Sequence, residues 1–419
     1  MRALSIGRLA AALAAALVVS SCGSGFQLGP PPTMSPAAGA ASGDFVPDEL
    51  LVRFRPGASA ARIAGEVGAS VVDRIGGIDV HVLRVEPARA EVVLQALSRN
   101  PNVEYAERNG IATLFADPND PYDNTTCYES SKHGCVMQWG WEKVQAYAAW
   151  DFTTGSGTVR IAVVDTGIDN SHEDLPPVAA QRDFVNNDNN AEDDNGHGTH
   201  VAGTIGALTN NGKGVAGANW AVSLLGVKVL SATGSGSYSA VANGIVWAAD
   251  QGAKAINLSL GGSLPSSTLR NAVDYAWNKG AVLACAAGNS GTKQKTYPAA
   301  YTNCIAVAAT DENDNKASFS NYGADWVDVA APGVRILSTM PDTVVYLNSQ
   351  YGYKTLYDSL NGTSMATPHV AGQAGLIWAR GQCTSASCVR NKIESTADPI
   401  PGTGNYWKWG RVNYHNSVK

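Results

Sequence analysis

Three residues whose types suit nucleophilic catalysis stand in three separate motifs of this chain. Asp165 ends the apolar run RIAVVD (160–165), His197 lies in DDNGHGTHVAG (193–203), and Ser364 lies in NGTSMATPHVAG (361–372). A serine hydroxyl becomes a nucleophile when an imidazole takes its proton and a carboxylate holds that imidazole in one tautomer. Each residue alone fits an ordinary role: a strand end, a packed histidine or a helix N-cap. The three together are what hydroxyl-based catalysis requires.

Apolar runs and helical patterns alternate around these motifs after residue 158. Strands are expected at 160–165, 222–230, 254–260, 281–287 and 304–310, and helices at 199–208, 238–250 and 267–279. Near-continuous apolar strands that alternate with helices are typical of a mostly parallel sheet with helices on both faces. The predicted fold class is therefore α/β. Functional groups in such sheets gather at the carboxyl ends of strands, where Asp165 stands.

The three motifs, in the order Asp, His, Ser, resemble those of the subtilase family of serine endopeptidases, most nearly its thermitase-like branch. The resemblance covers residues 117–419 and implies a subtilisin-like sheet. It implies Asp165 as the orienting carboxylate, His197 as the general base and then acid, and Ser364 as the nucleophile. Asn289 in AAGNSG (286–291) would donate to the oxyanion. Three further histidines are packing residues by the same precedent: His172, His200 and His369.

The resemblance also implies that substrate binds as an extended strand between two edges of the enzyme. Uncharged residues form these edges and the pocket for the residue before the cleaved bond: Gly234, Ser235, Gly236, Ser259, Leu260, Gly261, Ala286, Ala287 and Gly288. Because a preference for basic residues needs an acidic wall, we expect broad cleavage with an apolar or aromatic preference. Tyr297-Pro298 matches a family position where the peptide bond is cis.

Two segments resemble calcium sites of the family, and calcium prefers carboxylate and carbonyl oxygens. The loop LTNNGKGV (208–215) resembles the strong site, with these expected ligands: Asp120, Asp174, Leu208, Asn211, Lys213 and Val215. The segment DFVNNDNNAEDDNG (183–196) resembles an additional site of the thermitase-like branch, with these candidates: Asp183, Asp188, Asn190 and Glu192. Asn186 stands where that branch has an acid, which predicts weaker binding at the additional site.

A smaller α+β unit precedes the catalytic segment. Residues 44–110 show the order β-α-β-β-α-β, with strands expected at 49–55, 70–75, 78–85 and 103–107 and helices near 59–68 and 90–97. This order is typical of a ferredoxin-like domain. The resemblance implies a propeptide that assists folding and inhibits the enzyme until self-cleavage removes it. The predicted divisions are an export signal (1–21), a flexible tether (22–43), a propeptide domain (44–115) and a catalytic domain (116–419).

The first 21 residues are typical of an export signal. Arg2 and Arg8 precede an apolar run at 9–19 that is too short to span a bilayer stably. Val19-Ser20-Ser21-Cys22 resembles a bacterial lipobox, which predicts a lipid on Cys22, with ordinary signal cleavage as the alternative. Residues 23–43 are uncharged and rich in Gly, Ser, Ala and Pro, as expected for a tether. A precursor anchored at the cell envelope would then release a secreted, monomeric enzyme.

Six cysteines follow this segment, and an even number in an exported chain favours disulfides. Short spacings predict two local bridges and leave a third pair by elimination: Cys127–Cys135, Cys383–Cys388 and Cys285–Cys304. A zinc site is the competing interpretation, but the chain has no CxxC.

Composition limits the other classes of function. Charged residues make up only 16% of the 419 residues, which excludes a disordered chain or a coiled coil. The balance of 30 basic against 36 acidic residues disfavours nucleic-acid binding. A serine esterase of the α/β-hydrolase type needs GxSxG and the order Ser, Asp, His, and this chain has neither. A catalytically inactive subtilase that acts as a binding module is the remaining alternative.

Overall fold

The structure is a computed structural model that describes residues 45–75, 78–110, 118–124 and 126–419. The chain divides into two compact units, Met1–Thr113 and Leu114–Lys419. The predicted export signal, the tether, Cys22 and the predicted domain boundary after residue 115 lie outside the described residues. No helix in the described part of the chain combines the length and the apolar character needed to cross a membrane.

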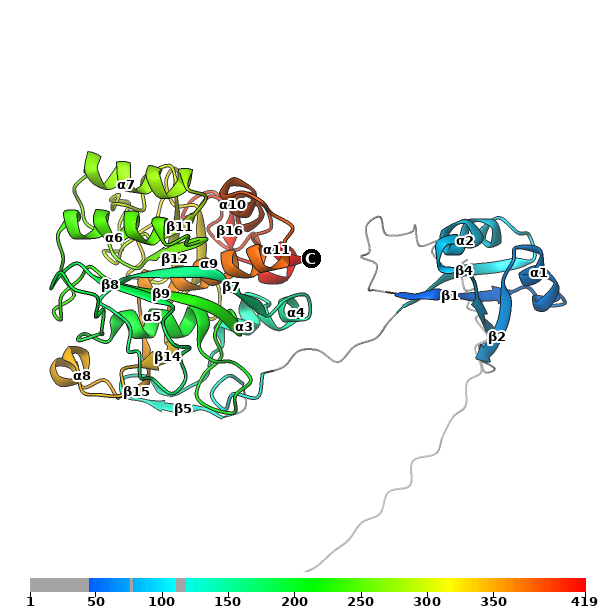
Figure 1. The fold of residues 1–419 in the computed structure, drawn as a ribbon, viewed down its shortest axis with the longest axis horizontal. Coiled ribbons are helices and arrows are strands. Elements are labelled where there is room, and N and C mark those ends of the chain that lie inside the picture. The colour runs from blue at the N-terminus through cyan, green and yellow to red at the C-terminus, as the bar shows by residue number, and fades with distance from the viewer. Residues whose placement is uncertain (1–44, 76–77, 111–117, 125) are drawn as a thin grey trace, which may run out of the picture. The chain divides into compact units, whose positions relative to one another are not determined.

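The smaller unit is a four-stranded antiparallel sheet with helices packed on it (Figure 1). Its elements are β1 (Phe45–Phe54), α1 (Ala60–Glu66), β2 (Ser70–Ile75), β3 (Val80–Arg84), the 3₁₀ turn η1 (Pro87–Arg89), α2 (Ala90–Ser98) and β4 (Val103–Gly110). Leu50 and Val52 of β1 pack with Val93 and Leu97 of α2, because alternate strand residues and i, i+4 helix residues share a face. The strand order β2-β3-β1-β4 confirms the ferredoxin-like prediction.

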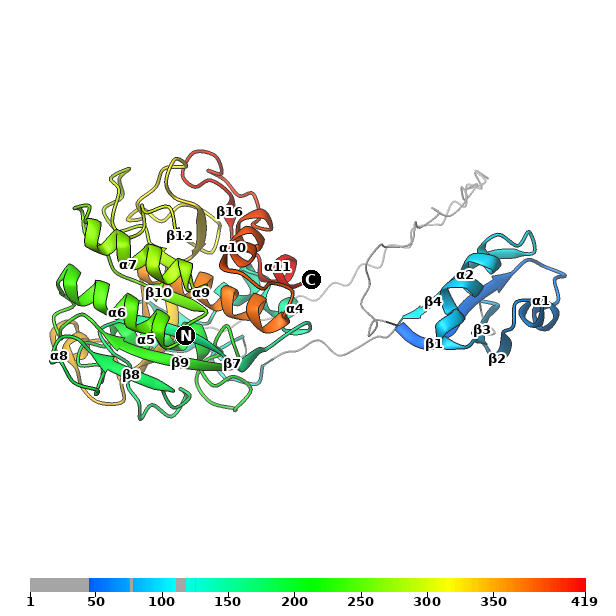
Figure 2. The same ribbon diagram turned by 45° about the horizontal axis from the view of Figure 1, so that its top comes forward.

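The larger unit is built on an eight-stranded sheet (Figures 1 and 2). Its strands are β7 (Gly155–Asp165), β8 (Ala180–Asp183), β9 (Ala221–Lys228), β10 (Ala255–Leu258), β11 (Val282–Ala286), β12 (Cys304–Thr310), β13 (Val329–Pro332) and β16 (Gly410–Arg411). They lie in the order β16-β13-β12-β11-β10-β7-β9-β8, and every pair is parallel. The predicted α/β class is confirmed.

Helices cover both faces of this sheet. One face carries α5 (His197–Gly206) and α9 (Thr363–Arg380), and the other carries α6 (Tyr238–Asp250) and α7 (Ser267–Asn278), as Figure 1 shows. Along β7, Ile161 and Val163 belong to the first core, and Ala162 and Val164 belong to the second. The buried part of the strand is apolar on both sides for this reason. The remaining helices are α3 (Gly140–Lys143), α4 (Ala146–Trp150), α8 (Tyr346–Tyr351), α10 (Ala386–Ser395) and α11 (Tyr414–Val418).

Two small antiparallel pairs complete the larger unit. They are β14 (Ile336–Met340) with β15 (Leu356–Leu360), and the hairpin β5 (Tyr128–Ser130) with β6 (Gly134–Val136). The sequence did not predict either pair, because polar residues such as Asp358 and Ser359 interrupt the apolar pattern although they are fully buried.

The cysteines form two of the three expected bridges. Cys127–Cys135 and Cys383–Cys388 are disulfides, whereas Cys285 and Cys304 are buried free thiols. The expected third bridge is therefore wrong for this structure. The register of β11 and β12 pairs Cys285 with Ala306 and Cys304 with Leu283, so the two cysteines are diagonal neighbours. The two free thiols are in contact, since a hydrogen bond with Cys304 adds to burial in raising the pKa of Cys285.

Candidate active site

The predicted triad residues lie at one edge of the parallel sheet. Asp165 is the last residue of β7, His197 is the first of α5, and Ser364 is the second of α9. Ser364 also contacts Ser259, the residue after β10, which is the neighbour of β7. The three motifs are far apart in the chain, and the carboxyl ends of adjacent parallel strands bring them together.

Asp165 and His197 form a buried pair. Asp165 is 0% exposed, and its Oδ1 accepts from His197 Nδ1 at 2.7 Å and from Thr166 N at 2.8 Å. Its Oδ2 is buried with no hydrogen-bond partner among the described atoms. Burial of the imidazole lowers the pKa of His197, but the Asp165 carboxylate outweighs burial and holds that pKa above its usual range. The pair therefore fixes the imidazole tautomer and makes Nε2 a stronger base.

The loop before His197 is held by Asp193, which the sequence analysis did not single out. Its Oδ1 accepts from Thr166 Oγ1, Asn195 N and Gly196 N, and its Oδ2 accepts from both Thr199 N and Thr199 Oγ1. The carboxylate thereby caps the start of α5 and ties it to the residue after Asp165.

A close approach of backbone to backbone supports the same junction. A Cβ on Gly198 would overlap the carbonyl oxygen of Gly167, so only glycine fits directly after His197.

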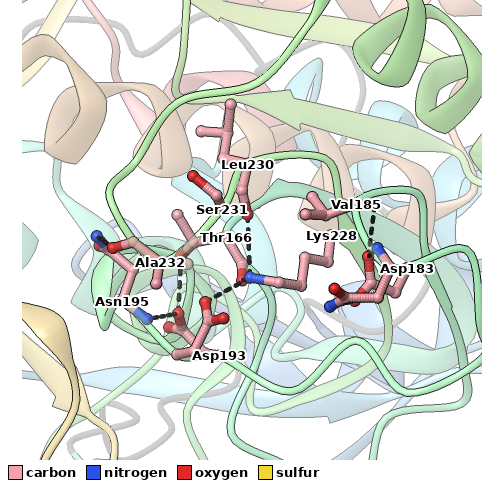
Figure 3. A network of polar contacts seen from close by, with 12 residues as sticks. Thr166, Asp183, Val185, Asp193, Asn195, Lys228, Leu230, Ser231 and Ala232 are labelled. Carbon is pink, nitrogen blue, oxygen red and sulfur yellow. Dashed lines mark hydrogen bonds and ion pairs between the residues drawn. The ribbon is translucent and has the colours of Figure 1, made fainter.

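Lys228 joins three segments of the site (Figure 3). Its ammonium group donates to Thr166 O at 2.6 Å, to Leu230 O at 3.0 Å and to Asp194 Oδ1 at 2.5 Å. Its side chain is only 2% exposed, and three acceptors match the three donors of an ammonium group. The lysine therefore fastens the end of β9 to the strand end that carries Asp165 and to the loop before His197.

Ser364 is oriented by a reciprocal pair of hydrogen bonds with Ser259. Ser364 Oγ donates to Ser259 O at 3.1 Å, and Ser259 Oγ donates to Ser364 O at 2.7 Å. Four residues further along α9 stands Pro368, which has no N–H to donate to Ser364 O. Ser259 takes over that bond, so the helix can keep a proline near its start without leaving the half-buried Ser364 carbonyl unpaired.

Asn289 lies directly after the Ala286-Ala287-Gly288 segment, with its amide fixed on one side. Its Oδ1 accepts from Thr363 N and Thr363 Oγ1, both at 2.9 Å, which turns Nδ2 the other way. A Cβ placed on Gly362 would lie 3.5 Å from Asn289 Nδ2, 3.5 Å from Ser364 N and 3.5 Å from Met365 Sδ. Two nitrogen atoms that can donate hydrogen bonds therefore lie at similar distances from one point beside Ser364. This is the arrangement that stabilises a developing oxyanion.

The expected substrate edges border these groups. Gly234, Ser235 and Gly236 are exposed in the loop after β9, and a Cβ on Gly236 would overlap Val229 O. Asn195 Nδ2 donates to Ala232 O of the same loop at 2.5 Å.

The second edge and the pocket walls follow neighbouring strands. Ser259–Gly261 come after β10, and Ala286–Gly288 come at the end of β11. The Tyr297-Pro298 bond is cis, as predicted, and Tyr297 exchanges two backbone hydrogen bonds with Gly262 at 2.8 and 2.9 Å.

The other three histidines have packing positions. His200 Nε2 contacts Ile336 O at 2.9 Å, His369 Nδ1 contacts Met365 O at 2.9 Å, and His172 Nε2 contacts Leu356 O at 2.8 Å. Burial lowers the pKa of all three, to about 3 for His200 and about 4 for His369. They are therefore neutral where His197 titrates.

The loop 208–215 brings two buried carboxylates together. Asp120 and Asp174 are 1% and 0% exposed, and no ion pair of the described residues ends on either. Burial raises the pKa of both carboxyl groups; that of Asp174 reaches about 7, with a smaller contribution from the neighbouring Asp120. No hydrogen bond between described residues ends on the carbonyl oxygens of three expected ligands: Leu208, Lys213 and Val215. Asn211 donates through Nδ2 to Asp174, and its Oδ1 accepts from Lys213 N, so this amide would have to turn to offer oxygen to a cation.

The segment 183–192 is arranged differently. Asp183 accepts from Val185 N, Asn186 N and Asn186 Nδ2 at 2.6–2.9 Å, so a turn uses its oxygens. Asp188 Oδ1 accepts from Asn190 N. Within the described residues, no group of carboxylate oxygens gathers Asp183, Asp188 and Glu192 within 4.8 Å. These three carboxylates do not form one cluster, and the additional calcium site stays a prediction.

Sequence reasoning missed Lys228, Asp193 and the hydroxyl of Ser259. Lys228 had a usable signal, since it is the one charged residue inside the apolar run VSLLGVKVL (222–230). A charge in a strand that helices cover on both faces needs buried acceptors. The Ser259 hydroxyl had no signal, because its partner is a carbonyl 105 residues away.

Comparison with known proteins agrees with this geometry. A sequence model of the subtilase family matches residues 156–412, and a model of the fervidolysin N-terminal prodomain matches residues 31–109. Thermitase from Thermoactinomyces vulgaris is 52% identical over 303 residues, which cover 72% of this chain and 99% of thermitase. The thermophilic serine proteinase of Bacillus sp. (strain AK1) is 45% identical over 90% of this chain and 88% of its own. A solved protease structure from Pseudoalteromonas arctica PAMC 21717 superimposes with a TM-score of 0.63 at 31% identity, over 72% of this chain and 99% of that one.

Proposed function

The chain belongs to the subtilase family of serine proteases and carries a prodomain, and we propose that it is an endopeptidase whose triad is Asp165, His197 and Ser364. Ser364 Oγ attacks the peptide carbonyl, and His197 Nε2 takes the proton and then gives it to the leaving amine. Asp165 keeps the proton on Nδ1 and stabilises the imidazolium. Asn289 Nδ2 and the Ser364 N–H bind the oxyanion.

The hydrogen bond from His197 Nδ1 to Asp165 Oδ1 carries this proposal, because it holds the proton on Nδ1 and leaves Nε2 as the base, at the start of a helix that packs on α9. Ser364 Oγ must leave Ser259 O and turn to Nε2 when substrate binds. Hydrogen bonds of this kind often tighten only in the substrate complex. Because the pKa of His197 is raised above the ordinary histidine value of 6.5, we expect acidification to begin to remove activity at a pH above 6.5.

Incubation of the processed enzyme with an unfolded protein tests the activity. We expect peptide fragments, no cleavage after treatment with a serine-directed covalent inhibitor, and inhibitor mass on the peptide that contains Ser364. The Ser364→Ala variant is the matched control and should neither cleave nor be labelled. Cleavage by pure Ser364→Ala protein would overturn the assignment.

We expect broad specificity with an apolar or aromatic preference before the cleaved bond. The support is that neither Ser259–Gly261 nor Ala286–Gly288 contains a charge, and Ala286 and Ala287 are buried. A set of peptides that differ only at this position, with Phe, Ala, Lys or Asp, measures the preference. Phe should give the highest kcat/KM, and a fastest reaction with Lys would contradict the proposal.

We expect the N-terminal unit, predicted at residues 44–115, to act as a propeptide that the enzyme itself removes. The prodomain match and the independent four-stranded fold of residues 45–110 support this. Ser364→Ala protein should stay full-length and folded, and the parent should process itself. Efficient processing of pure Ser364→Ala protein would contradict self-cleavage.

Calcium is proposed for the loop 208–215. Asp120 and Asp174 would hold it together with the carbonyl oxygens of three residues: Leu208, Lys213 and Val215. Two buried carboxylates without a cationic partner among the described residues, next to unpaired carbonyls, suit this hard divalent cation. A bound cation would lower the free energy of the folded state and keep Asp174 ionised. The segment 183–192 is not included, since a turn already uses the Asp183 oxygens.

Export with a lipid on Cys22 is proposed from the sequence of residues 1–43. Cleavage near residues 109–117 would separate the catalytic unit from that lipid and release it. Fractionation of cells that express Ser364→Ala precursor tests this, with Cys22→Ala as the control. If the precursor is in the soluble fraction both with Cys22 and with Cys22→Ala, the proposed lipid on Cys22 is contradicted.

A further inference from the structure

The triad chemistry does not use the hairpin β5–β6, although this hairpin lies next to the segment that leads into Ser364. The Cys127–Cys135 disulfide closes it, and it packs on β15. Three residues separate the end of β15 at Leu360 from Ser364. His133, at the turn of the hairpin, has both ring nitrogens in hydrogen-bond contact with this region.

The first ring nitrogen begins a chain of hydrogen bonds that ends on a buried carboxylate. His133 Nδ1 lies 2.6 Å from Ser359 Oγ, Ser359 Oγ lies 2.6 Å from Ser130 Oγ, and Ser130 Oγ donates to Asp358 Oδ1 at 2.6 Å. Asp358, Ser359 and Ser130 are all buried. Since a carboxylate only accepts and each hydroxyl donates once, the protons in this chain point toward Asp358. His133 Nδ1 is therefore the donor to Ser359.

The second ring nitrogen contacts Asn361, whose amide is oriented from its other end. Arg335 N donates to Asn361 Oδ1 at 2.6 Å, which directs Nδ2 toward His133 Nε2 at 3.0 Å. An amide N–H needs an acceptor, so Nε2 carries no proton. Only the neutral imidazole with its proton on Nδ1 satisfies both ends.

The charged groups around His133 agree with a neutral ring. Burial lowers the pKa of His133 below its usual range; Asp358 of β15 opposes that shift, and the Arg335 guanidinium supports it. Glu312 pairs with Arg335 at 2.6 Å, and the Lys354 ammonium is bonded to the Glu129 carbonyl. The imidazole is therefore an acceptor for Asn361 at the pH where His197 acts as a base.

We propose that His133 is a positioning residue for the nucleophile: its Nε2 fixes the Asn361 amide and thereby the segment Asn361–Ser364. The backbone of this segment is also tied by Gly362 N to Gly333 O at 2.9 Å and by Thr363 N to Asn289 Oδ1. A shift of Asn361 is thus passed to both the nucleophile and the oxyanion donors. This inference rests on the proposed function of Ser364.

A pair of amide substitutions tests the contact. Glutamine places its Oε1 near the position of Nε2, so His133→Gln keeps an acceptor for Asn361. Asparagine reaches only the position of Nδ1, so His133→Asn keeps the Ser359 contact and loses Asn361. We expect kcat to fall about three- to tenfold in His133→Asn and His133→Ala with KM within about twofold, the effect of one lost hydrogen bond. His133→Gln should stay within about twofold of the parent.

The neighbouring Lys132→Ala is the matched control on the same hairpin and should not change kcat. If His133 only stabilises the hairpin, the opposite order is expected, with a higher kcat in His133→Asn than in His133→Gln. That order, or an unchanged kcat in His133→Ala, would overturn the proposal.

Asn361→Ala probes the same contact from its other side, in case His133→Ala does not fold. After Asn361→Ala, the further change His133→Asn should alter kcat by less than about twofold, because the interaction is already lost. Additive losses would overturn the proposal. All rates are expressed per site labelled by a serine-directed inhibitor. If the parent is not labelled at Ser364, the proposed function fails and this inference with it, whereas a labelled parent with unaffected variants overturns this inference alone.

Discussion

Buried carboxylates in two regions of the catalytic unit have opposite surroundings. At the sheet edge, Asp193 accepts five hydrogen bonds and Asp165 faces His197, so protein groups compensate each negative charge. In the loop 208–215, Asp120 and Asp174 accept hydrogen bonds from neutral N–H groups, but no cationic group of the described residues pairs with either, and burial raises the pKa of both. Buried negative charge without a cationic partner is costly, and a bound cation would offset it. We therefore expect changes at the sheet edge to affect chemistry and changes in the loop to affect stability.

Among substitutions that keep the nucleophile, the largest effect is expected for Asp165→Asn. The amide presents a donor toward His197 Nδ1 or favours the wrong tautomer, so kcat should fall by about 10⁴-fold. Thermal unfolding should change little, since the substitution removes a buried charge whose Oδ2 has no partner among the described atoms. Single-turnover rates and Tm measured on the same preparation check both statements. A large loss of Tm would contradict the comparison, because it would show that a change at the sheet edge affects stability as well as catalysis.

Asn289→Ala should reduce kcat by about 10²–10³-fold, the known cost of losing one oxyanion donor, with KM nearly unchanged. The oxygen of this amide also accepts two bonds from Thr363, so a displaced Ser364 is a second source of loss in this variant. Asn289→Asp separates the two causes, because it keeps the acceptor and removes the donor. Activity of Asn289→Asp close to that of the parent would contradict the oxyanion role.

Calcium should act on stability. At a concentration about 100-fold above Kd, it should raise Tm by roughly 5–10 °C. In chelator, the pKa of Asp174 is about 7 in the folded state against 3.8 for an ordinary aspartate, so the folded state holds the extra proton between these values. Stability without calcium should therefore decrease as the pH rises from about 4 to about 7, and calcium should abolish this decrease.

Asp174→Asn is the control for the calcium effect and should remove most of it, while inhibitor labelling of Ser364 continues. If neither calcium nor Asp174→Asn changes the melting temperature, the proposed calcium site in the loop 208–215 is contradicted.

The smallest effect is expected for Asp183→Asn. This change weakens a turn that three N–H donors complete, so Tm should fall by a few degrees, or about 1 kcal/mol of unfolding free energy. The fall should be equal with calcium and with chelator. A loss seen only in calcium would assign a cation to the segment 183–192 after all.

Much of the molecule could be predicted from the sequence. Strands such as 304–310 and helices such as 238–250 are observed at the predicted residues, because both faces of the sheet are buried and the apolar signal is strong. The pairs β5–β6 and β14–β15 were missed, because buried polar side chains such as Ser130, Asp358 and Ser359 interrupt the apolar pattern of their strands. Cys285 and Cys304, which were expected to form a bridge, are free thiols in hydrogen-bond contact, and counting cysteines could not distinguish this from a disulfide.

The amino-acid sequence by itself determined the chemical groups, their order and the family. Catalysis needs particular residue types, and the glycines beside them make each motif recognisable. Tertiary structure alone decided how each group is satisfied. Ser259 supplies the bond that Pro368 cannot make, Lys228 finds three acceptors, and a turn uses the Asp183 oxygens, whereas Asp174 has hydrogen bonds but no cationic partner among the described residues. These partners are distant in the chain, and burial sets their energies, so no local pattern records them.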